Sequence, residues 1–431
     1  MTTITENPET VVLHSGTYRS DSATNSVAVP IYQTTSYQFE NTEHAGNLFA
    51  LKELGNIYTR IMNPTNAVLE ERVAALEGGV AALAVASGQA AVAMSIQNLC
   101  SAGDNIVSSP YIYGGTWNLF ANTFKQFGID VRFADPDNVE SYRDLTDENT
   151  RAYFAETLPN PKLKVFPIEE VASIGAEHNI PLIVDNTAAP ITCRAIDYGA
   201  AIVVHSLTKY IGGHGSSIGG IIIDSGKFDW TKDPNRQPLF NLPDPSYHGA
   251  VWGTLIPDAL GAPIAYAIRA RVVLLRDLGS ALSPTNAFNF IQGLETLPIR
   301  FRVHQENAQK VAEYLNNHKK VSKVIYPSLF LGTEKERVQK YLKRGCGPLV
   351  GFELSDGLEG GKRFIDKLKL IYHVANIGDV RTLAIHPATT THSQLSKEDQ
   401  LKAGVTEGYV RLAVGIEHID DIILDIAQAL E

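Results

Sequence analysis

The chain has few cysteines and fewer basic residues than acidic ones. Its 431 residues include only three cysteines, and 19% are charged, with a formal net charge of −10. Cys100, Cys193 and Cys346 are far apart and follow no CxxC or metal-ligand spacing, which argues against a disulfide framework or a zinc site and favours free thiols in a reducing cytoplasm. No cluster of lysine and arginine is present, so we expect neither nucleic acid nor an anionic membrane as a partner.

Several other signals are missing. The first residues have neither the basic nor the apolar region of a secretory signal, and no apolar run reaches transmembrane length. The sequence has no G-x-x-x-x-G-K-[ST] phosphate loop and no G-x-G-x-x-G motif, which argues against a P-loop or a nicotinamide-binding fold. The twelve histidines are scattered, and His205 and His214 lack metal-binding spacing, so no metal is expected.

The pattern along the chain predicts an α/β fold with a mostly parallel central sheet flanked by helices. Residues 1–60 are polar and rich in turns and are expected to form an N-terminal arm, 61–280 a large domain, and 281–431 a smaller α/β domain. Residues 228–261 are predicted to be an irregular excursion, and 262–278 a helix. The predicted strands of the large domain are 82–86, 105–108, 130–133, 152–156, 183–184, 202–204 and 220–223.

The segment from His205 to Gly215 carries the strongest chemical signal. It places Lys209 between hydroxyl residues and glycines, directly after the apolar residues 200–204. An amine at the end of a buried strand can be desolvated, which lowers its pKa and makes it nucleophilic. The hydroxyls of Ser206 and Thr208 and nearby backbone N–H groups suit a phosphate, although such hydroxyls also cap turns. A nucleophilic amine beside a phosphate site is what pyridoxal phosphate requires, whereas a solvated loop lysine is the alternative.

A second strand supports the cofactor. Residues 180–184 are apolar and end in Asp185. An ionised aspartate can hold the proton on the pyridine nitrogen that makes pyridoxal phosphate an electron sink. Because Asp185 and Lys209 both follow strands, we expect them at the carboxyl edge of the sheet, where open α/β folds bind ligands. An aspartate at this position can also serve as a turn former.

Further polar residues follow other predicted strands. Ser87, Gly88 and Gln89 open a helix whose N-terminal amides could hold a phosphate. Tyr113 precedes two glycines and could stack on an aromatic ring, although an isolated tyrosine more often packs in a core. Asn160 could donate to the phenolate oxygen of the cofactor. Arg411 has apolar neighbours and could bind a substrate carboxylate, with an internal salt bridge as the alternative.

Taken together and in order, these segments resemble the Cys/Met-metabolism family of PLP-dependent transsulfuration enzymes. The match includes residues 58–65, 87–88, 113–116, 184–187, 206–214, 243–249, 293–300 and 375–379. The resemblance implies a fold-type I enzyme, usually a tetramer built from two tight dimers. It implies Lys209 as the Schiff-base lysine, Asp185 as the pyridinium partner, Tyr113 as the stacking residue and Arg411 as the carboxylate ligand.

The same resemblance implies roles for the remaining residues. Ser87, Gly88, Gln89, Ser206 and Thr208 would bind the phosphate, Tyr58 and Arg60 would reach it across the dimer, and Asn376 would contact substrate. Within the family the sequence looks most like members that exchange the acetate of O-acetylhomoserine for sulfide, giving homocysteine. Gly115 and Asn376 stand where lyases often have cysteine and many members have serine, which argues against a dedicated γ-lyase.

Alternative functions remain open on these residues. A cystathionine γ-synthase or a methionine or cystathionine γ-lyase would use the same cofactor site. A non-catalytic protein that keeps the fold is a further alternative, against which the set Lys209, Asp185, Tyr113 and Arg411 argues. The sequence leaves open whether acetyl or succinyl esters are preferred and which sulfur donor is used.

Overall fold

A computed structural model of the chain describes residues 5–391, 393, 396–402 and 404–431. Its centre is a seven-stranded sheet in the order β1-β7-β6-β5-β4-β2-β3. Only β7 runs antiparallel to its neighbours, so the predicted mostly parallel sheet is confirmed. The strands are β1 (Ala81–Val85), β2 (Asn105–Ser108), β3 (Asp130–Phe133), β4 (Thr150–Glu156), β5 (Leu182–Asp185), β6 (Ile202–Ser206) and β7 (Gly220–Asp224).

Helices cover both faces of this sheet because successive strand residues are apolar on both sides. Ile183 belongs to one buried apolar cluster, and Val184 belongs to the other. Helix α3 shows how local sequence sets the boundaries: the Asn63 side chain accepts the Thr65 N–H at 2.9 Å, and Gly78 ends the helix at φ 77°. The principal helices before residue 230 are α1 (Pro8–His14), α2 (Thr42–Phe49), α3 (Pro64–Glu77), α4 (Gly88–Gln97), α5 (Gly114–Asn118), α7 (Glu140–Asp144) and α8 (Ile168–Glu177).

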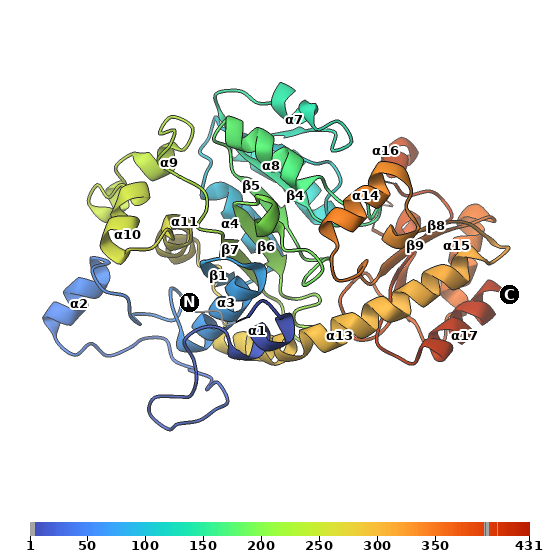
Figure 1. Cartoon of the computed structure of the whole chain (residues 1–431), viewed down its shortest axis with the longest axis horizontal. Helices are drawn as coiled ribbons and strands as arrows, with labels where there is room; N and C mark the ends of the chain where they lie inside the picture. Colours follow the sequence, from blue (N-terminus) through green and yellow to red (C-terminus); the bar gives the residue numbers. More distant parts are fainter. Residues whose placement is uncertain (1–4, 392, 394–395, 403) are drawn as a thin grey trace.

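The N-terminal segment lies mostly outside the sheet layers. Figure 1 shows it looping out from the body of the molecule, with α2 near its outer end. Ser36 forms an isolated antiparallel bridge with Tyr58, and α1 packs against α3 and α13. The bridge closes the loop that carries α2 within the segment, and α1 attaches the first part of the segment to the body of the protein.

The expectation of an irregular excursion at 228–261 was only partly right, because short helices interrupt the irregular chain. This stretch contains α9 (Pro238–Asn241), a short 3-10 turn (Pro245–Tyr247) and α10 (Trp252–Leu260). Proline at the first position of α9 starts the helix rather than breaking it, since that N–H needs no partner. Stacked rings of Trp230, Phe240 and Tyr266 then hold the segment against the body of the protein.

The predicted helix at 262–278 is present in an altered form. Its helical part runs through α11 (Ala265–Arg269) and α12 (Arg276–Leu278), with a π-helical stretch at Ala270–Leu275 between them. Periodicity alone does not distinguish an α-helix from one with an inserted π turn.

A second, five-stranded sheet forms the C-terminal part of the molecule, in the order β10-β11-β12-β9-β8. The 33-residue helix α13 (Pro284–Asn316) leads to it and packs on α3 and on β8, so it touches both halves, as Figure 1 shows. The remaining elements are β8 (Val321–Ile325), α14 (Gly332–Tyr341), β9 (Leu349–Leu354), α15 (Gly357–Lys367), β10 (Tyr372–His373), β11 (Leu383–Ile385), α16 (Lys397–Lys402), β12 (Tyr409–Ala413) and α17 (Ile419–Leu430).

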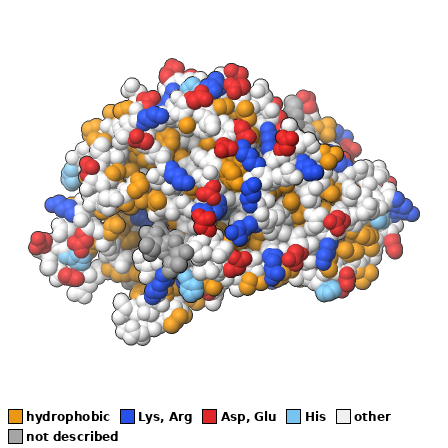
Figure 2. Space-filling view, viewed as in Figure 1, with side chains coloured by type: hydrophobic (Ala, Val, Ile, Leu, Met, Phe, Trp, Pro, Cys, Tyr) orange, Lys and Arg blue, Asp and Glu red, His pale blue; other side chains and the backbone are white. Residues whose placement is uncertain are grey.

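Figure 2 shows acidic and basic side chains interspersed on the face in view. Among the described helices, none combines the length and apolar character that crossing a membrane requires.

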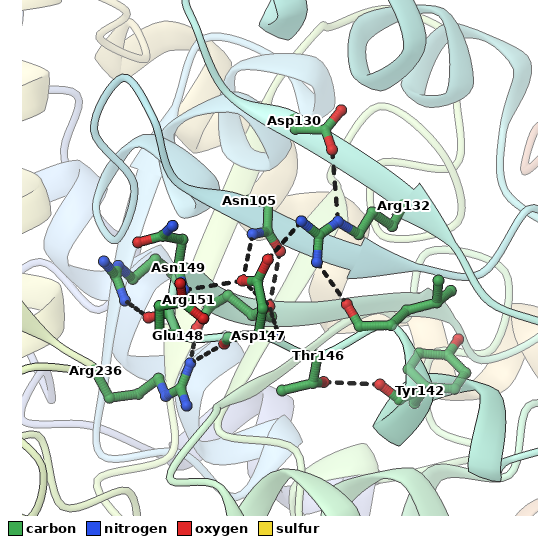
Figure 3. Close-up of polar contacts among 12 residues, drawn as sticks. Asn105, Asp130, Arg132, Tyr142, Thr146, Asp147, Glu148, Asn149, Arg151 and Arg236 are labelled. Carbon is green, nitrogen blue, oxygen red and sulfur yellow. Dashed lines mark hydrogen bonds and ion pairs between the residues drawn. The ribbon is translucent and has the colours of Figure 1, made fainter.

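A polar network ties together the amino ends of β2, β3 and β4 (Figure 3). The Asp147 carboxylate accepts hydrogen bonds from Asn105 at 2.8 Å and from Arg132 at 2.6 Å. Arg236 donates to the backbone carbonyls of Asp147 and Thr150. Burial opposes ionisation of Asp147, but the bonds from Asn105 and Arg132 outweigh it and lower its pKa to about 2.

Candidate active site

A cavity of about 290 Å³ opens at the opposite, carboxyl edge of the large sheet, where the C-terminal part meets it. Every predicted site residue except Tyr58 and Arg60 lines this cavity. Loops after β1, β2, β4, β5 and β6 supply most of them, because parallel strands all end at this edge. The lining residues are Ser87, Gly88, Gln89, Tyr113, Glu156, Leu158, Asn160, Asp185, Thr187, Ala188, Ser206, Thr208, Lys209, Ile218, Ala375, Asn376, Ile377 and Arg411.

Lys209 is half-buried in the cavity and is not a solvated loop lysine. Its amine donates a hydrogen bond to the Asn376 side-chain oxygen. Burial, and then the positive charge of Arg411, lower the pKa of Lys209. Gly378 (φ 79°) allows the loop after Asn376 to approach the Lys209 backbone, since a Cβ there would lie 2.8 Å from the Lys209 Cα. The C-terminal part therefore packs directly onto the lysine segment.

Asp185 ends β5 and lies beneath the same cavity. Its carboxylate accepts the Thr187 N–H at 2.9 Å, so the turn-forming interaction expected of a strand-terminal aspartate is present too. Burial raises the pKa of Asp185, while the bonds from Thr187 and the nearby His205 act in the opposite direction. A carboxyl group whose pKa stays raised despite these contacts favours a cationic ligand group in the cavity.

The N-terminus of α4 forms an anion cup together with the lysine segment. The Ser87 hydroxyl accepts the Ala90 N–H at 3.1 Å, while the N–H groups of Gly88 and Gln89 have no hydrogen-bond partner among the described residues. A Cβ on Gly88 would lie 2.6 Å from that of Ser206, so only glycine allows this approach. The Thr208 hydroxyl bonds with the backbone of Gly219, which shows the local capping role beside its place in the cavity.

Tyr113 and Asn160 face the cavity from two further strand ends. The Tyr113 side chain is 59% exposed, so it is not a core residue. Its ring lies against Gly115, where a Cβ would come within 2.4 Å of it. The Asn160 side-chain oxygen is buried and has no partner among the described residues. Both side chains thus have contact capacity left for a ligand.

Arg411 lies on β12 at the far side of the cavity. One guanidinium nitrogen donates to the Asn376 carbonyl at 2.9 Å, and Nε is buried without a partner in the described chain. Burial lowers the pKa of Arg411. The alternative of an internal salt bridge is not found, because no described carboxylate pairs with this guanidinium. Its fork remains available for a carboxylate ligand.

Tyr58 and Arg60 lie outside the cavity of their own chain. The Arg60 guanidinium sits 5.0 Å from the centre of the Tyr58 ring, and Tyr58 is 39% exposed. Their predicted action across a dimer therefore stays a prediction.

Seven residues line the cavity without having been predicted as site residues: Glu156, Leu158, Thr187, Ala188, Ile218, Ala375 and Ile377. For Glu156 the signal was present: like Asp185, it is the last, acidic residue of a buried strand. Ile218 and Ile377 lie in loops whose position depends on tertiary packing, and nothing local marks them.

Residues 9–431 match the sequence model of a protein family, which is described as Cys/Met metabolism PLP-dependent enzyme. The chain belongs to this family. Its members' cofactor, pyridoxal phosphate, is therefore the cofactor of this enzyme as well.

Relatives of this Cys/Met metabolism enzyme are similar over nearly their whole length. An O-acetyl-L-homoserine sulfhydrylase from Leptospira meyeri is 52% identical, with 98% of this chain and 96% of the relative covered. One from Thermus thermophilus is 49% identical, with 98% and 99% covered. A solved structure from Campylobacter jejuni, described as an O-acetylhomoserine (thiol)-lyase carrying a pyridoxyl-lysine monophosphate, has a TM-score of 0.94 at 43% identity, with 98% and 99% covered.

The chemical groups that line the cavity of this enzyme are those that pyridoxal phosphate requires. The cavity holds a desolvated amine at Lys209, a buried carboxylate at Asp185 and unpartnered amides at Gly88 and Gln89. These correspond to the aldehyde, the ring nitrogen and the phosphate of pyridoxal phosphate.

Proposed function

We propose that this enzyme is an O-acetyl-L-homoserine sulfhydrylase. It replaces the acetate on Cγ of O-acetyl-L-homoserine by sulfide and releases L-homocysteine and acetate. The full-length similarity to relatives named for this activity supports the proposal. The cavity supports it as well, since it combines a desolvated amine with an arginine free to bind a carboxylate.

When bound, pyridoxal phosphate supplies a reactive aldehyde and a ring that stabilises negative charge on substrate carbons. In the proposed arrangement Lys209 binds the cofactor and later moves protons at the substrate Cα and Cβ. Asp185 holds a proton on the ring nitrogen, and Tyr113 stacks on the ring. Arg411 binds the substrate α-carboxylate, assisted by Asn376. Ser87, Gly88, Gln89, Ser206 and Thr208 hold the phosphate, and Asn160 donates to the ring oxygen.

One observation carries this assignment more than the others. Asn376 contacts Lys209 through its side chain and Arg411 through its carbonyl. Asn376 thereby contacts both the amine that transfers protons and the arginine that binds the substrate carboxylate. A substrate anchored at Arg411 presents its adjacent Cα towards Lys209, which proton transfer at Cα requires.

The test is a panel of substrates with the holoenzyme. O-acetylhomoserine with sulfide is expected to give homocysteine much faster than O-acetylhomoserine with cysteine gives cystathionine. Without a nucleophile, little 2-oxo acid and ammonia should form. Faster reaction with cysteine would instead identify a cystathionine γ-synthase, and rapid oxo-acid release a γ-lyase. Replacing the acetyl ester by the succinyl ester in each arm determines the acyl preference.

We further propose a cytoplasmic homotetramer, built as a dimer of dimers, whose chains divide into an arm (1–60), a large cofactor-binding domain (61–280) and a small domain (281–431). In such a dimer Tyr58 and Arg60 bind the phosphate of the neighbouring site. The exposed Tyr58–Arg60 pair outside its own cavity is consistent with this arrangement. Co-assembly of inactive Lys209→Ala and Arg60→Ala chains should restore part of the activity, whereas self-contained sites would give none.

A further inference from the structure

The cavity contains a second buried carboxyl group that the proposed function does not use. Glu156 ends β4 where Asp185 ends β5, and the two residues are paired in the register of these parallel strands. Adjacent strands lie about 4.8 Å apart, so the two carboxyl groups are close neighbours. Glu156 is 9% exposed, and both residues line the cavity. Two carboxylates in such a place cannot both be ionised without a cation for each.

The surroundings of Glu156 supply no such cation. Its carboxyl oxygen accepts the backbone N–H of Tyr113. Neither cationic side chain of the cavity, Lys209 or Arg411, forms an ion pair with it, and both are hydrogen-bonded to Asn376 instead. Burial, and then the charge of Asp185, raise the pKa of Glu156 well above its ordinary value.

The hydrogen bond from Tyr113 is a principal constraint on that residue. Tyr113 precedes α5, its side chain makes no cap bond, and its ring is mostly exposed above Gly115. The direction in which the ring enters the cavity therefore depends on the backbone, which Glu156 holds at the N–H and the first turn of α5 holds at the carbonyl, through the Trp117 N–H at 2.9 Å.

We propose that Glu156 is a positioning residue whose neutral carboxylic acid fixes the Tyr113 backbone and leaves Asp185 as the single charged carboxylate facing the cofactor ring. This inference rests on the proposed placement of the ring between Tyr113 and Asp185. One carboxylate balances the one proton on the ring nitrogen, and a second negative charge beside it would remain uncompensated.

Two substitutions of Glu156 test whether its carboxyl group acts in the neutral or in the charged form. Glu156→Gln is uncharged and still offers an oxygen to the Tyr113 N–H. We expect it to keep the visible circular dichroism of the bound cofactor and to shift the pH titration of its absorbance by less than about half a unit. Glu156→Ala leaves the N–H unpaired and frees Tyr113, so kcat should fall ~10-fold to 100-fold, with altered visible circular dichroism and a smaller change in KM.

Glu70 offers a matched control, because it is a buried glutamate that also accepts a backbone N–H, from Ala84 at 2.8 Å. Unlike Glu156, it pairs with an arginine, Arg271, at 2.6 Å. Glu70→Gln should therefore lower the melting temperature without changing the cofactor spectrum, whereas Glu156→Gln should change neither.

The proposal is overturned if Glu156→Gln shifts the titration and loses activity as Glu156→Ala does, since the charge would then matter. It is also overturned if Glu156→Ala matches the unmodified enzyme in spectrum and kcat. Failure of the proposed function is distinguishable: it would appear in the unmodified holoenzyme as absence of homocysteine formation, whatever the spectra of the variants.

Discussion

The two edges of the large sheet treat their polar side chains in opposite ways. At the amino edge Asp147 is surrounded by donors, and its pKa is lowered to about 2. At the carboxyl edge burial raises the pKa of Asp185 and lowers that of Lys209, and Arg411 keeps a buried nitrogen unpartnered in the described chain. The charge of Asp147 is thus stabilised by donors of the protein, whereas Asp185 lines a cavity that has room for a cationic ligand group.

This difference follows from strand direction. All strands of the large sheet except β7 end at the carboxyl edge, so loops from many parts of the chain converge there. Some of their polar groups, such as the Asn160 side-chain oxygen and Arg411 Nε, have no partner in the described chain, which is unfavourable for stability but suits binding. Substitutions at the carboxyl edge should therefore change activity, and substitutions at the amino edge should change stability.

The largest effect is expected for Lys209→Ala. Removing the amine should abolish the absorbance of the lysine-bound cofactor and lower turnover ~1000-fold or more, with the fold retained. Lys162 serves as the control: burial lowers its pKa to about 8, but it lies over the Tyr111 ring outside the cavity. Lys162→Ala should keep its activity. Full turnover by Lys209→Ala would remove this lysine from the mechanism.

Arg411→Ala should mainly affect substrate capture. Loss of charge-assisted bonds worth about 1.5–3 kcal/mol should raise KM for O-acetylhomoserine ~10-fold to 100-fold while the cofactor stays bound. Arg411→Lys retains the charge but not the planar fork, so an intermediate KM is expected. Steady-state kinetics with absorbance spectra checks both. An unchanged KM would mean that the carboxylate binds elsewhere.

Asp147→Ala tests the amino edge. Loss of the bonds from Asn105 and Arg132 should lower the free energy of unfolding by about 1–2 kcal/mol and leave kcat and KM unchanged. The lowered pKa gives stability that is present above the unfolded-state value near 4 and lost as the pH falls towards 2. Urea unfolding at pH 7 and pH 3 measures this, and the variant should lose less stability on acidification. Asp130, 61% exposed and 3.6 Å from Arg132, is the control, and Asp130→Ala should change stability by less than about 0.5 kcal/mol.

The smallest effect is expected at Ser87. This residue bears on stability because it caps α4, and on cofactor binding because it lines the cavity. Ser87→Ala should lower stability by about 1 kcal/mol through loss of the cap. Ser87→Asp keeps a capping oxygen but adds negative charge beside the anion cup, so stability should hold while cofactor affinity falls. Equal cofactor affinity in the two variants would place the phosphate away from α4.

Much of this site was predictable from the sequence because its residues follow buried strands. Asp185 and Lys209 are preceded by apolar runs, and parallel strand ends must meet at one edge. The helices within 228–261 were missed because proline and aspartate there act as helix starts and caps, which depends on the packed rings of Trp230 and Phe240. Glu156 ends a buried strand as Asp185 does, but only the register of β4 with β5 shows that the two carboxyl groups are neighbours.

The bond between Lys209 and Asn376 joins the two sheets of the molecule, since the amine follows β6 and its partner lies between β10 and β11. A slight shear between the two sheets would lengthen this bond before it altered any covalent geometry. The 33-residue helix α13 packs on α3 and on β8, so it bears on the relative position of the two sheets and thereby on the distance between Lys209 and Asn376.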